Sequence, residues 1–170
     1  AYELRNYTNY IVGAPSEVPG EGLPYDSAIK YMFGSSEQDY KVLAKAIHDN
    51  PKVGDNKSVP PSVVKTSALE DLRQATLSLV KSGKFEAEHC NFSNTIYYYR
   101  VEGCPIMYDM QNIMLNNLDS NSYTEWKKTF DKAVVYKAAG SQWNTLYPSI
   151  FNDFTVSEEN YGGLSMFVPN

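Results

Sequence analysis

The feature that most constrains the fold is a change of hydrophobic period within the segment 62–83. The residues SVVKTSA (62–68) are rich in β-branched side chains, which is typical of a strand. The following 15 residues, 69–83, carry apolar side chains at helical spacing and end at Gly83, which is typical of a helix. The same criteria predict further strands at 7–15, 133–140 and 162–170. Strands that alternate with helices predict an α/β fold with a mostly parallel sheet.

Four other segments predict helices. The segment 36–51 is amphipathic and ends at Pro51. In the segment 24–34, Asp26 or Ser27 is expected to cap the helix at its N-terminus. Two later helices are expected at 107–118 and 122–133, and together with the strand that follows them they fill 107–140.

The size and charge of the chain restrict its function. A length of 170 residues favours one domain, and a hydrophobic share of 42% with 14 Tyr and 7 Phe indicates a globular protein. The net charge is −5 and the sequence has no basic stripe, so it lacks the charge pattern of a protein that binds nucleic acid. No apolar run reaches the ~20 residues of a membrane helix, and the first residues lack the pattern of a signal peptide. We therefore expect no nucleic acid as partner and no membrane span.

The segment 13–26, GAPSEVPGEGLPYD, predicts a stiff and acidic loop. Its three prolines fix φ angles and its three glycines permit conformations that other residues avoid, so one definite path is expected. Ligands of open parallel sheets bind outside the carboxyl ends of the strands, and this loop leaves such an end. Glu17 and Glu21 are therefore candidates for pairing with a basic ligand group, although solvated loop charges are an equal alternative at this point.

The cysteines and histidines do not form a recognisable site. Cys90 and Cys104 lack metal-binding spacing, and buried free thiols are expected rather than a disulfide. In an extended segment, His89 and Cys90 would point to opposite faces and could not act as a dyad. His48 is expected at a helix C-terminus, where a cation is favourable. Neither a metal cluster nor a phosphate-binding loop is present, so no metal and no cofactor are predicted.

Five segments match, in order, one known peptidase family. The first, AYELRNYTNYIVGAPSEVPGEGLPYD, resembles the segment that follows the nucleophile of that family. The others are SVVKTSALEDL, CPIMYDMQNIM, KAVVYKAAG and YGGLSMFVPN. Each motif alone is weak, but their order covers nearly the whole chain. They are similar to the clostripain-like (C11-type) cysteine peptidases, caspase-fold relatives of gingipains and legumains, in the form seen in Bacteroides-type gut anaerobes.

The resemblance implies a fold and a reaction. The fold is a caspase-like α/β/α sandwich, and the reaction is peptide-bond hydrolysis by a Cys/His dyad, commonly after Arg or Lys. In the family both dyad residues precede the segment that opens this chain, the Cys by only a few residues. Residues 1–170 would then be the C-terminal part of a single peptidase domain, with no catalytic residue of its own. The implied partners are the N-terminal half of the same peptidase and a peptide or protein substrate.

The resemblance also assigns roles in the loop 16–26. Glu21 stands in the family's PG-acid-G position and is the candidate for facing a basic side chain before the cleaved bond. Ser16 and Glu17 are candidates for contact with the substrate backbone or with that side chain. Asp26 is interpreted mainly as a helix cap, and Tyr25 as a packing residue.

Two further expectations depend on the same likeness. A secreted or cell-envelope location follows from it alone. The alternative function is a catalytically inactive caspase-like module for binding or for a structural role at the cell surface. An unrelated α/β binding domain would require the five ordered matches to be chance.

Overall fold

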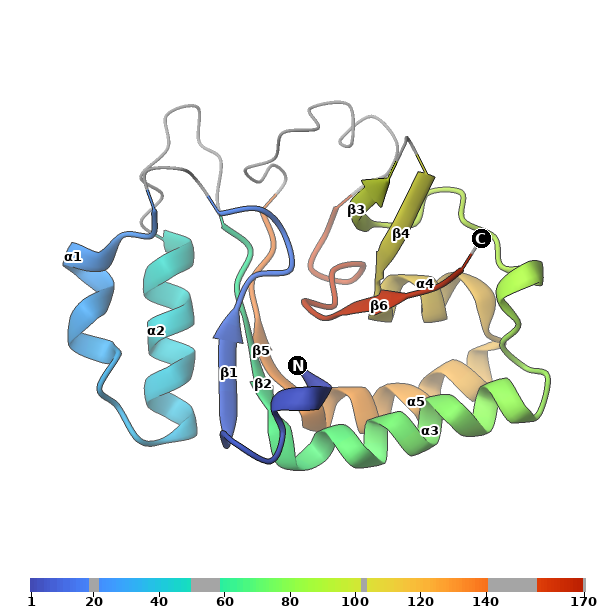
Figure 1. The fold of residues 1–170 in the computed structure, drawn as a ribbon, viewed down its shortest axis with the longest axis horizontal. Coiled ribbons are helices and arrows are strands. Elements are labelled where there is room, and N and C mark those ends of the chain that lie inside the picture. Colours follow the sequence, from blue (N-terminus) through green and yellow to red (C-terminus); the bar gives the residue numbers. More distant parts are fainter. Residues whose placement is uncertain (19–21, 50–58, 102–103, 141–155, 170) are drawn as a thin grey trace.

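The computed structural model describes residues 1–18, 22–49, 59–101, 104–140 and 156–169. Figure 1 shows a three-layer arrangement around one three-stranded sheet, whose strands are, in spatial order, β1 (Tyr10–Gly13), β2 (Ser62–Lys65) and β5 (Val134–Lys137). One face is covered by α2 (Glu37–Asp49), with α1 (Tyr25–Ala28) outside it. The other face is covered by α5 (Ser120–Ala133), which packs beside α3 (Leu69–Lys81). These layers form the predicted α/β sandwich.

A second small sheet lies beside these layers. Its central strand β4 (Cys104–Asp109) pairs with β3 (Tyr97–Val101) and with β6 (Ser165–Phe167). Helix α4 (Met110–Asn117) follows β4 directly, so this sheet is joined to the helical layer without a loop. The short 3-10 helices are η1 (Tyr2–Leu4), η2 (Ile29–Tyr31), η3 (Thr66–Ala68) and η4 (Ala87–His89). The strand expected over 162–170 is limited to the three residues of β6.

The prediction of a mostly parallel sheet is wrong for the described strands. Every pair among them is antiparallel, both in the sheet β1-β2-β5 and in the sheet β3-β4-β6. Two helices, α1 and α2, lie between β1 and β2, and they return the chain to the end of the sheet that it left (Figure 1). A single crossover helix would have delivered it to the opposite end and produced a parallel neighbour.

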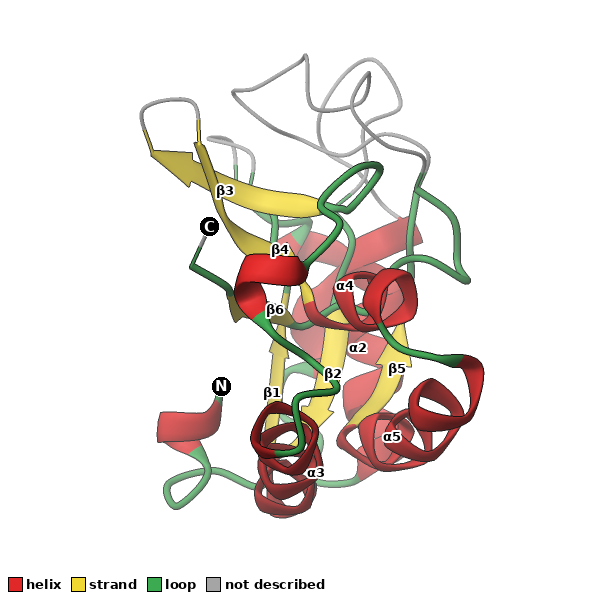
Figure 2. Ribbon diagram, turned by 90° about the vertical axis from the view of Figure 1, so that its right-hand side faces the viewer, coloured by secondary structure: helices red, strands yellow, loops and turns green. Residues whose placement is uncertain are grey.

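Strand β1 is an edge strand among the described residues. Ile11 pairs opposite Val64 of β2, and no described strand pairs with the other side of β1 (Figure 2). Residues 10–12 are half-buried, so the strand is shorter and more exposed than the buried strand expected over 7–15. Its outer backbone N–H and C=O groups form a ready template for another strand.

The two longest predicted amphipathic helices are present. Leu43, Ala44 and Ile47 of α2 are buried against the sheet, as the periodicity indicates. In α3, Leu69 and Leu72 are buried. Periodicity therefore locates both helices because each has one face in the core.

The start of α1 differs from expectation. Pro24, and not Asp26 or Ser27, is the N-cap residue, and Asp26 lies inside the first helical turn. Proline is tolerated at this position because the first N–H groups of a helix have no intrahelical partner, so the missing N–H of Pro24 costs no bond. The Asp26 carboxylate still lies near the positive end of the helix dipole.

The helix expected over 107–118 begins only at Met110. Met107 and Tyr108 belong to β4, where they pair opposite Phe167 and Met166 of β6. Asp109 marks the boundary between the two elements, because it is the last residue of β4 and the N-cap residue of α4.

Aromatic side chains fill the main core. The rings of Trp126 and Phe130 lie 5.1 Å apart on α5, and those of Phe92, in the segment before β3, and Tyr108 of β4 lie 4.9 Å apart. All four belong to one apolar cluster that joins the two sheets. Within the described ranges, every helix is too short or too polar to cross a membrane.

Replacing Thr76 by valine should lower the free energy of unfolding by about 1 kcal/mol. The Thr76 hydroxyl accepts a hydrogen bond from Nε1 of the buried Trp126 at 2.9 Å, and valine leaves that donor without its partner. Urea denaturation of the two proteins measures the loss.

Thr124→Val is the matched control for this prediction. Both hydroxyls donate a hydrogen bond to the carbonyl four residues earlier, and the bond of Thr124 measures 2.7 Å. Thr124 differs because it lies on the exposed side of α5. An equal loss in both variants would show that the tryptophan bond contributes nothing.

Candidate functional site

The loop that leaves the carboxyl end of β1 is the candidate site. Ser16 and Glu17 follow the strand within four residues, whereas Tyr25 and Asp26 lie beyond the loop in α1. The Tyr25 side chain is 51% exposed, which does not match the packing role expected for it. Glu21 lies outside the described residues. The substrate roles of these five residues stay predictions.

The Ser16 hydroxyl is the most informative group of the loop. Its Oγ is buried, and it makes no hydrogen bond with any group of the described residues. A buried hydroxyl without a partner costs roughly 1–3 kcal/mol. A ligand or a further protein segment that supplied a partner would remove this cost.

The N-terminal residue lies against the start of this loop. A cavity of about 130 Å³ is bounded by Ala1 on one side and by residues 13–15 on the other. Ser62 and Val64 of β2 and residues 163–165 complete its wall. A segment joined to Ala1 would therefore end next to the carboxyl end of β1.

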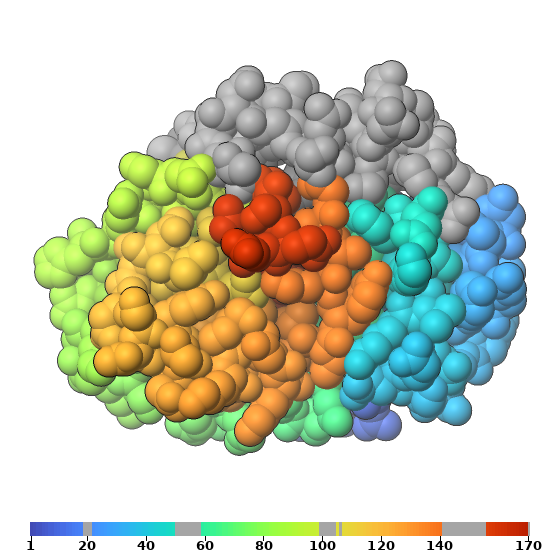
Figure 3. Space-filling view, turned by 180° about the vertical axis from the view of Figure 1, so that it is seen from behind, coloured from blue at the N-terminus to red at the C-terminus, as the bar shows by residue number. Residues whose placement is uncertain are grey.

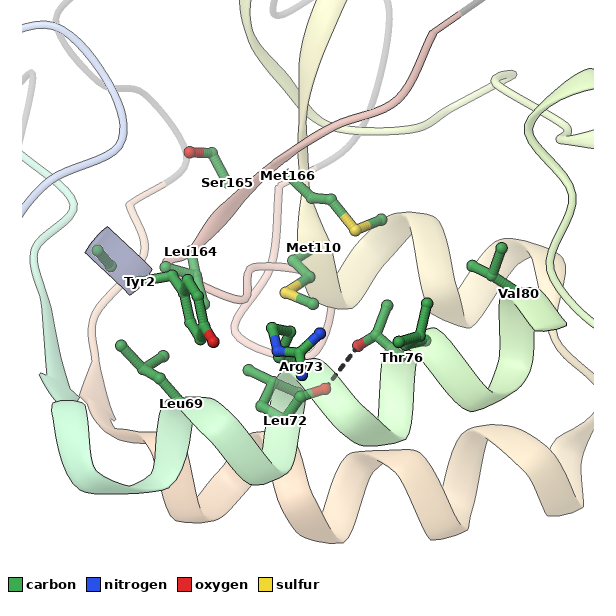
Figure 4. Close-up of a pocket in the computed structure, with 12 residues that line it drawn as sticks. Tyr2, Leu69, Leu72, Arg73, Thr76, Val80, Met110, Leu164, Ser165 and Met166 are labelled. Atoms are coloured by element: carbon green, nitrogen blue, oxygen red, sulfur yellow. Dashed lines mark hydrogen bonds between the residues drawn. The ribbon is translucent and has the colours of Figure 1, made fainter. Parts of the chain in front are cut away.

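A larger apolar pocket of about 430 Å³ adjoins the small cavity and shares Ala1, Leu164 and Ser165 with it. It lies between α3 and the segment that contains β6, with Met110 and Met166 above Leu72 (Figure 4). Tyr2, Arg73, Thr76 and Ser165 are the polar residues of its lining. Most of its lining side chains are apolar, so the pocket suits apolar side chains.

Asp109 is the centre of a buried polar network that the sequence reasoning missed. Its carboxylate accepts hydrogen bonds from the backbone N–H groups of Asn112 at 2.8 Å, Gly162 at 2.8 Å and Gly163 at 3.1 Å. It also accepts one from the Tyr98 hydroxyl. Burial raises the pKa of Asp109, and these four donors oppose that shift. The sequence signal was available, since an aspartate directly before a helix is a common N-cap.

The network fixes the last segment of the chain. A Cβ on Gly162 would lie 2.5 Å from Cβ of Gln111, and Gly163 has a φ of +74°, so glycine is required at both positions. Lys137 of β5 donates to Gln111 Oε1 at 2.9 Å and to the carbonyl of Tyr161. Figure 3 shows the segment from residue 156 (red) seated between α4 and β5. The walls of the small cavity at 163–165 are thereby held in place.

The histidines and the described thiol form no catalytic pair. His89 Nδ1 lies 2.6 Å from Glu86 Oε2, and the Cys90 thiol donates to the Glu86 carbonyl at 3.3 Å. Burial raises the pKa of this thiol, which is free and only partly buried. His48 lies in the last turn of α2, as expected, 3.3 Å from the Val59 carbonyl. No cluster of metal-ligating side chains occurs in the described ranges.

Three solved structures with the same fold are proteases by their descriptions. A cysteine protease of B. fragilis superposes with a TM-score of 0.82 at 25% identity, over 99% of this chain and 72% of that chain. An inactive zymogen of a C11 protease from Parabacteroides distasonis gives 0.78 at 24% identity, over 99% of this chain and 48% of that chain. A secreted C11 cysteine protease from Bacteroides thetaiotaomicron with an irreversible peptide inhibitor gives 0.74 at 22%, over 99% and 48%.

These likenesses show that the fold is the caspase-like fold of the C11 proteases. The chain spans 72% of the first of these proteins and about half of the other two. No curated protein matched the chain. The model of the clostripain family matches residues 1–168, and because this is almost the entire sequence, the chain belongs to the clostripain family of cysteine proteases.

Proposed function

We propose that this chain is the C-terminal part of a cysteine endopeptidase that cleaves after Arg or Lys. In this proposal it forms one wall of the pocket for the residue before the cleaved bond, and the Cys/His dyad comes from the N-terminal half of the same peptidase. The observation that carries the proposal is the match of the clostripain family over residues 1–168. Hydrolysis then proceeds by attack of a thiolate on the scissile carbonyl, with an imidazole protonating the leaving amine.

The described thiol and its neighbouring histidine support a dyad from elsewhere. A nucleophilic cysteine needs a lowered pKa and an imidazole within hydrogen-bond reach. Cys90 has a raised pKa, and the neighbouring His89 is paired with Glu86 instead. The chain alone is therefore expected to be inactive.

The open edge of β1 supports an N-terminal half as partner. Backbone groups on the outer side of β1 have no strand partner in the described chain, and a further strand would satisfy them. Ala1 and residues 13–15 line the same small cavity, so a chain that arrives at Ala1 would end near the carboxyl end of β1. A nucleophile a few residues before Ala1 would thus be near the candidate loop.

The acidic loop supports a basic specificity. A carboxylate from Glu21, with Glu17 nearby in the sequence, would form a charge-assisted pair with a cationic side chain, and bidentate geometry would favour Arg over Lys. Ser16 has a buried hydroxyl without a partner, which could form a hydrogen bond with the substrate backbone. In these proposed roles Tyr25 and Asp26 border the pocket from α1. One protein of similar fold, a clostripain of Bacteroides thetaiotaomicron, is described in complex with the peptide inhibitor BTN-VLTK-AOMK, whose peptide ends in lysine.

We also propose that the complete peptidase is secreted or attached to the cell envelope. The support is that one protein of the same fold is described as a secreted C11 protease. Fractionation of the producing cells, with detection of this chain in the medium or envelope, tests this point.

Co-production with the segment that precedes Ala1 tests the proposed function. The purified assembly should contain both parts in mass spectrometry and should cleave peptides after Arg or Lys, while the chain alone should not. Replacing the upstream nucleophilic cysteine by alanine should abolish cleavage but leave the assembly intact. An assembly that forms and cleaves nothing, or an upstream segment without that cysteine, would favour the inactive binding module.

A further inference from the structure

Tyr2 is anchored to helix α3 by one carboxylate. The Tyr2 hydroxyl donates a hydrogen bond to Oε2 of Glu70, a residue 68 positions later in the first turn of α3. The same carboxylate accepts bonds from Arg73 Nη2 at 2.7 Å and from Gln74 Nε2 at 2.9 Å. Glu70 is thus held in one orientation by its own helix and presents one oxygen to Tyr2.

Two guanidinium groups hold the ring of Tyr2. Cζ of Arg5 lies 3.8 Å from the ring centroid, and Cζ of Arg73 lies 5.9 Å from it, both within the range of cation–π attraction. Arg5 also donates from Nη1 to the Tyr2 carbonyl at 3.1 Å. Figure 4 shows Tyr2 and Arg73 side by side above α3. Tyr2 is thus the residue that ties the segment 1–5 to α3.

The segment that Tyr2 anchors, residues 1–5, borders the candidate site through Ala1. Ala1, directly before Tyr2, lines both the small cavity beside residues 13–15 and the larger apolar pocket. A displacement of Tyr2 would move Ala1 relative to the loop that leaves β1. Misplacement of a reacting group by about 1 Å can cost up to about 100-fold in rate.

We propose that Glu70 is a positioning residue, which acts through Tyr2 to hold the segment that joins Ala1 to the catalytic nucleophile in register with the loop after β1. This inference rests on the proposed function, in which the nucleophile precedes Ala1. Neither Glu70 nor Tyr2 touches the substrate in this role. Their effect is expected on the rate of the chemical step and not on substrate affinity.

The anchor is expected to be intact at neutral pH. The bonds from Arg73 and Tyr2 lower the pKa of Glu70 to about 2. A carboxyl group with a lowered folded-state pKa contributes stability above its ordinary value of 4.5 and loses it as the pH falls towards 2. The ratio of variant to wild-type rates should therefore be constant above about pH 5.

Three variants of the peptidase assembled with its N-terminal half test the proposal. Glu70→Ala should lower kcat about fivefold with KM unchanged. Tyr2→Phe, which retains the ring and loses only the hydroxyl, should lower kcat in the same direction, and the double variant should be no worse than Glu70→Ala. Asp71→Ala is the matched control because it removes a carboxylate from the same helical turn, and its kcat should equal that of the wild type.

Hydrogen exchange provides a readout that does not need activity. The amides of Leu4 and Arg5 bond to the carbonyls of Ala1 and Tyr2, and they should exchange at least roughly fivefold faster in Glu70→Ala than in Asp71→Ala. Unchanged exchange, or equal kcat in the Glu70 and Asp71 variants, would overturn the proposal. If the wild-type assembly has no activity, the proposed function fails, and the exchange rates still decide whether Glu70 anchors the segment.

Discussion

Replacing Glu21 by glutamine should lower kcat/KM for substrates with Arg before the cleaved bond by roughly tenfold or more in the assembled peptidase. Glutamine keeps the size of the side chain and removes its charge, so the change isolates the pairing of a carboxylate with a guanidinium. Such a pair, when partly shielded from water, is stronger than a bond between neutral groups. The measurement is the initial rate of hydrolysis of otherwise identical Arg, Lys and citrulline peptides.

The citrulline peptide separates charge recognition from shape recognition. Citrulline has nearly the shape of Arg without its charge, so the Glu21→Gln variant should process the Arg and citrulline peptides at similar rates. Glu125→Gln is the control for net charge, because Glu125 is 72% exposed on α5 and far along the chain from the loop. A wild-type preference for Arg that survives in Glu21→Gln would remove Glu21 from the pocket and leave Glu17 as the candidate.

Local patterns predicted the elements whose structure depends on local forces. The helices α2 and α3 were located because Leu43, Ile47, Leu69 and Leu72 recur at the helical period and face the core. The boundary between β4 and α4 was missed because the apolar run before Asp109 fits either a strand end or a helix start. The antiparallel order was missed because it depends on where α1 and α2 return the chain, which no single segment encodes.

The candidate site also combines a feature that local sequence predicts with contacts that it does not predict. The loop after β1 is predicted as the site from its composition and from its place at a strand end. The contacts that hold its surroundings join distant positions, such as Tyr2 with Glu70 and Asp109 with Gly162, and no local period reports them. The expectation of a dyad before Ala1 depends on the family resemblance, because neither the local sequence patterns nor the described contacts contain it.

Replacing Asp109 by alanine should lower the free energy of unfolding by about 4 kcal/mol, since it leaves several buried donors without an acceptor. The donors are the N–H groups of Asn112, Gly162 and Gly163 and the hydroxyl of Tyr98. The same change releases residues 162–163 from β4, and with them the wall of the small cavity next to Ala1. We therefore expect activity in the assembled peptidase to fall at temperatures where the variant is still folded.

Two further variants keep this prediction testable if Asp109→Ala does not fold. Tyr98→Phe removes one donor and leaves the carboxylate in place, so its cost should be about 1–2 kcal/mol in urea denaturation. Asp119→Ala is the matched control, because Asp119 caps α5 through the N–H groups of Asn121 and Ser122 at the surface and should cost less than Asp109. Equal costs for the two aspartates would mean that Asp109 acts only as a helix cap. The larger cost at Asp109 follows because its donors come from three separate parts of the chain and their shared carboxylate is fully buried.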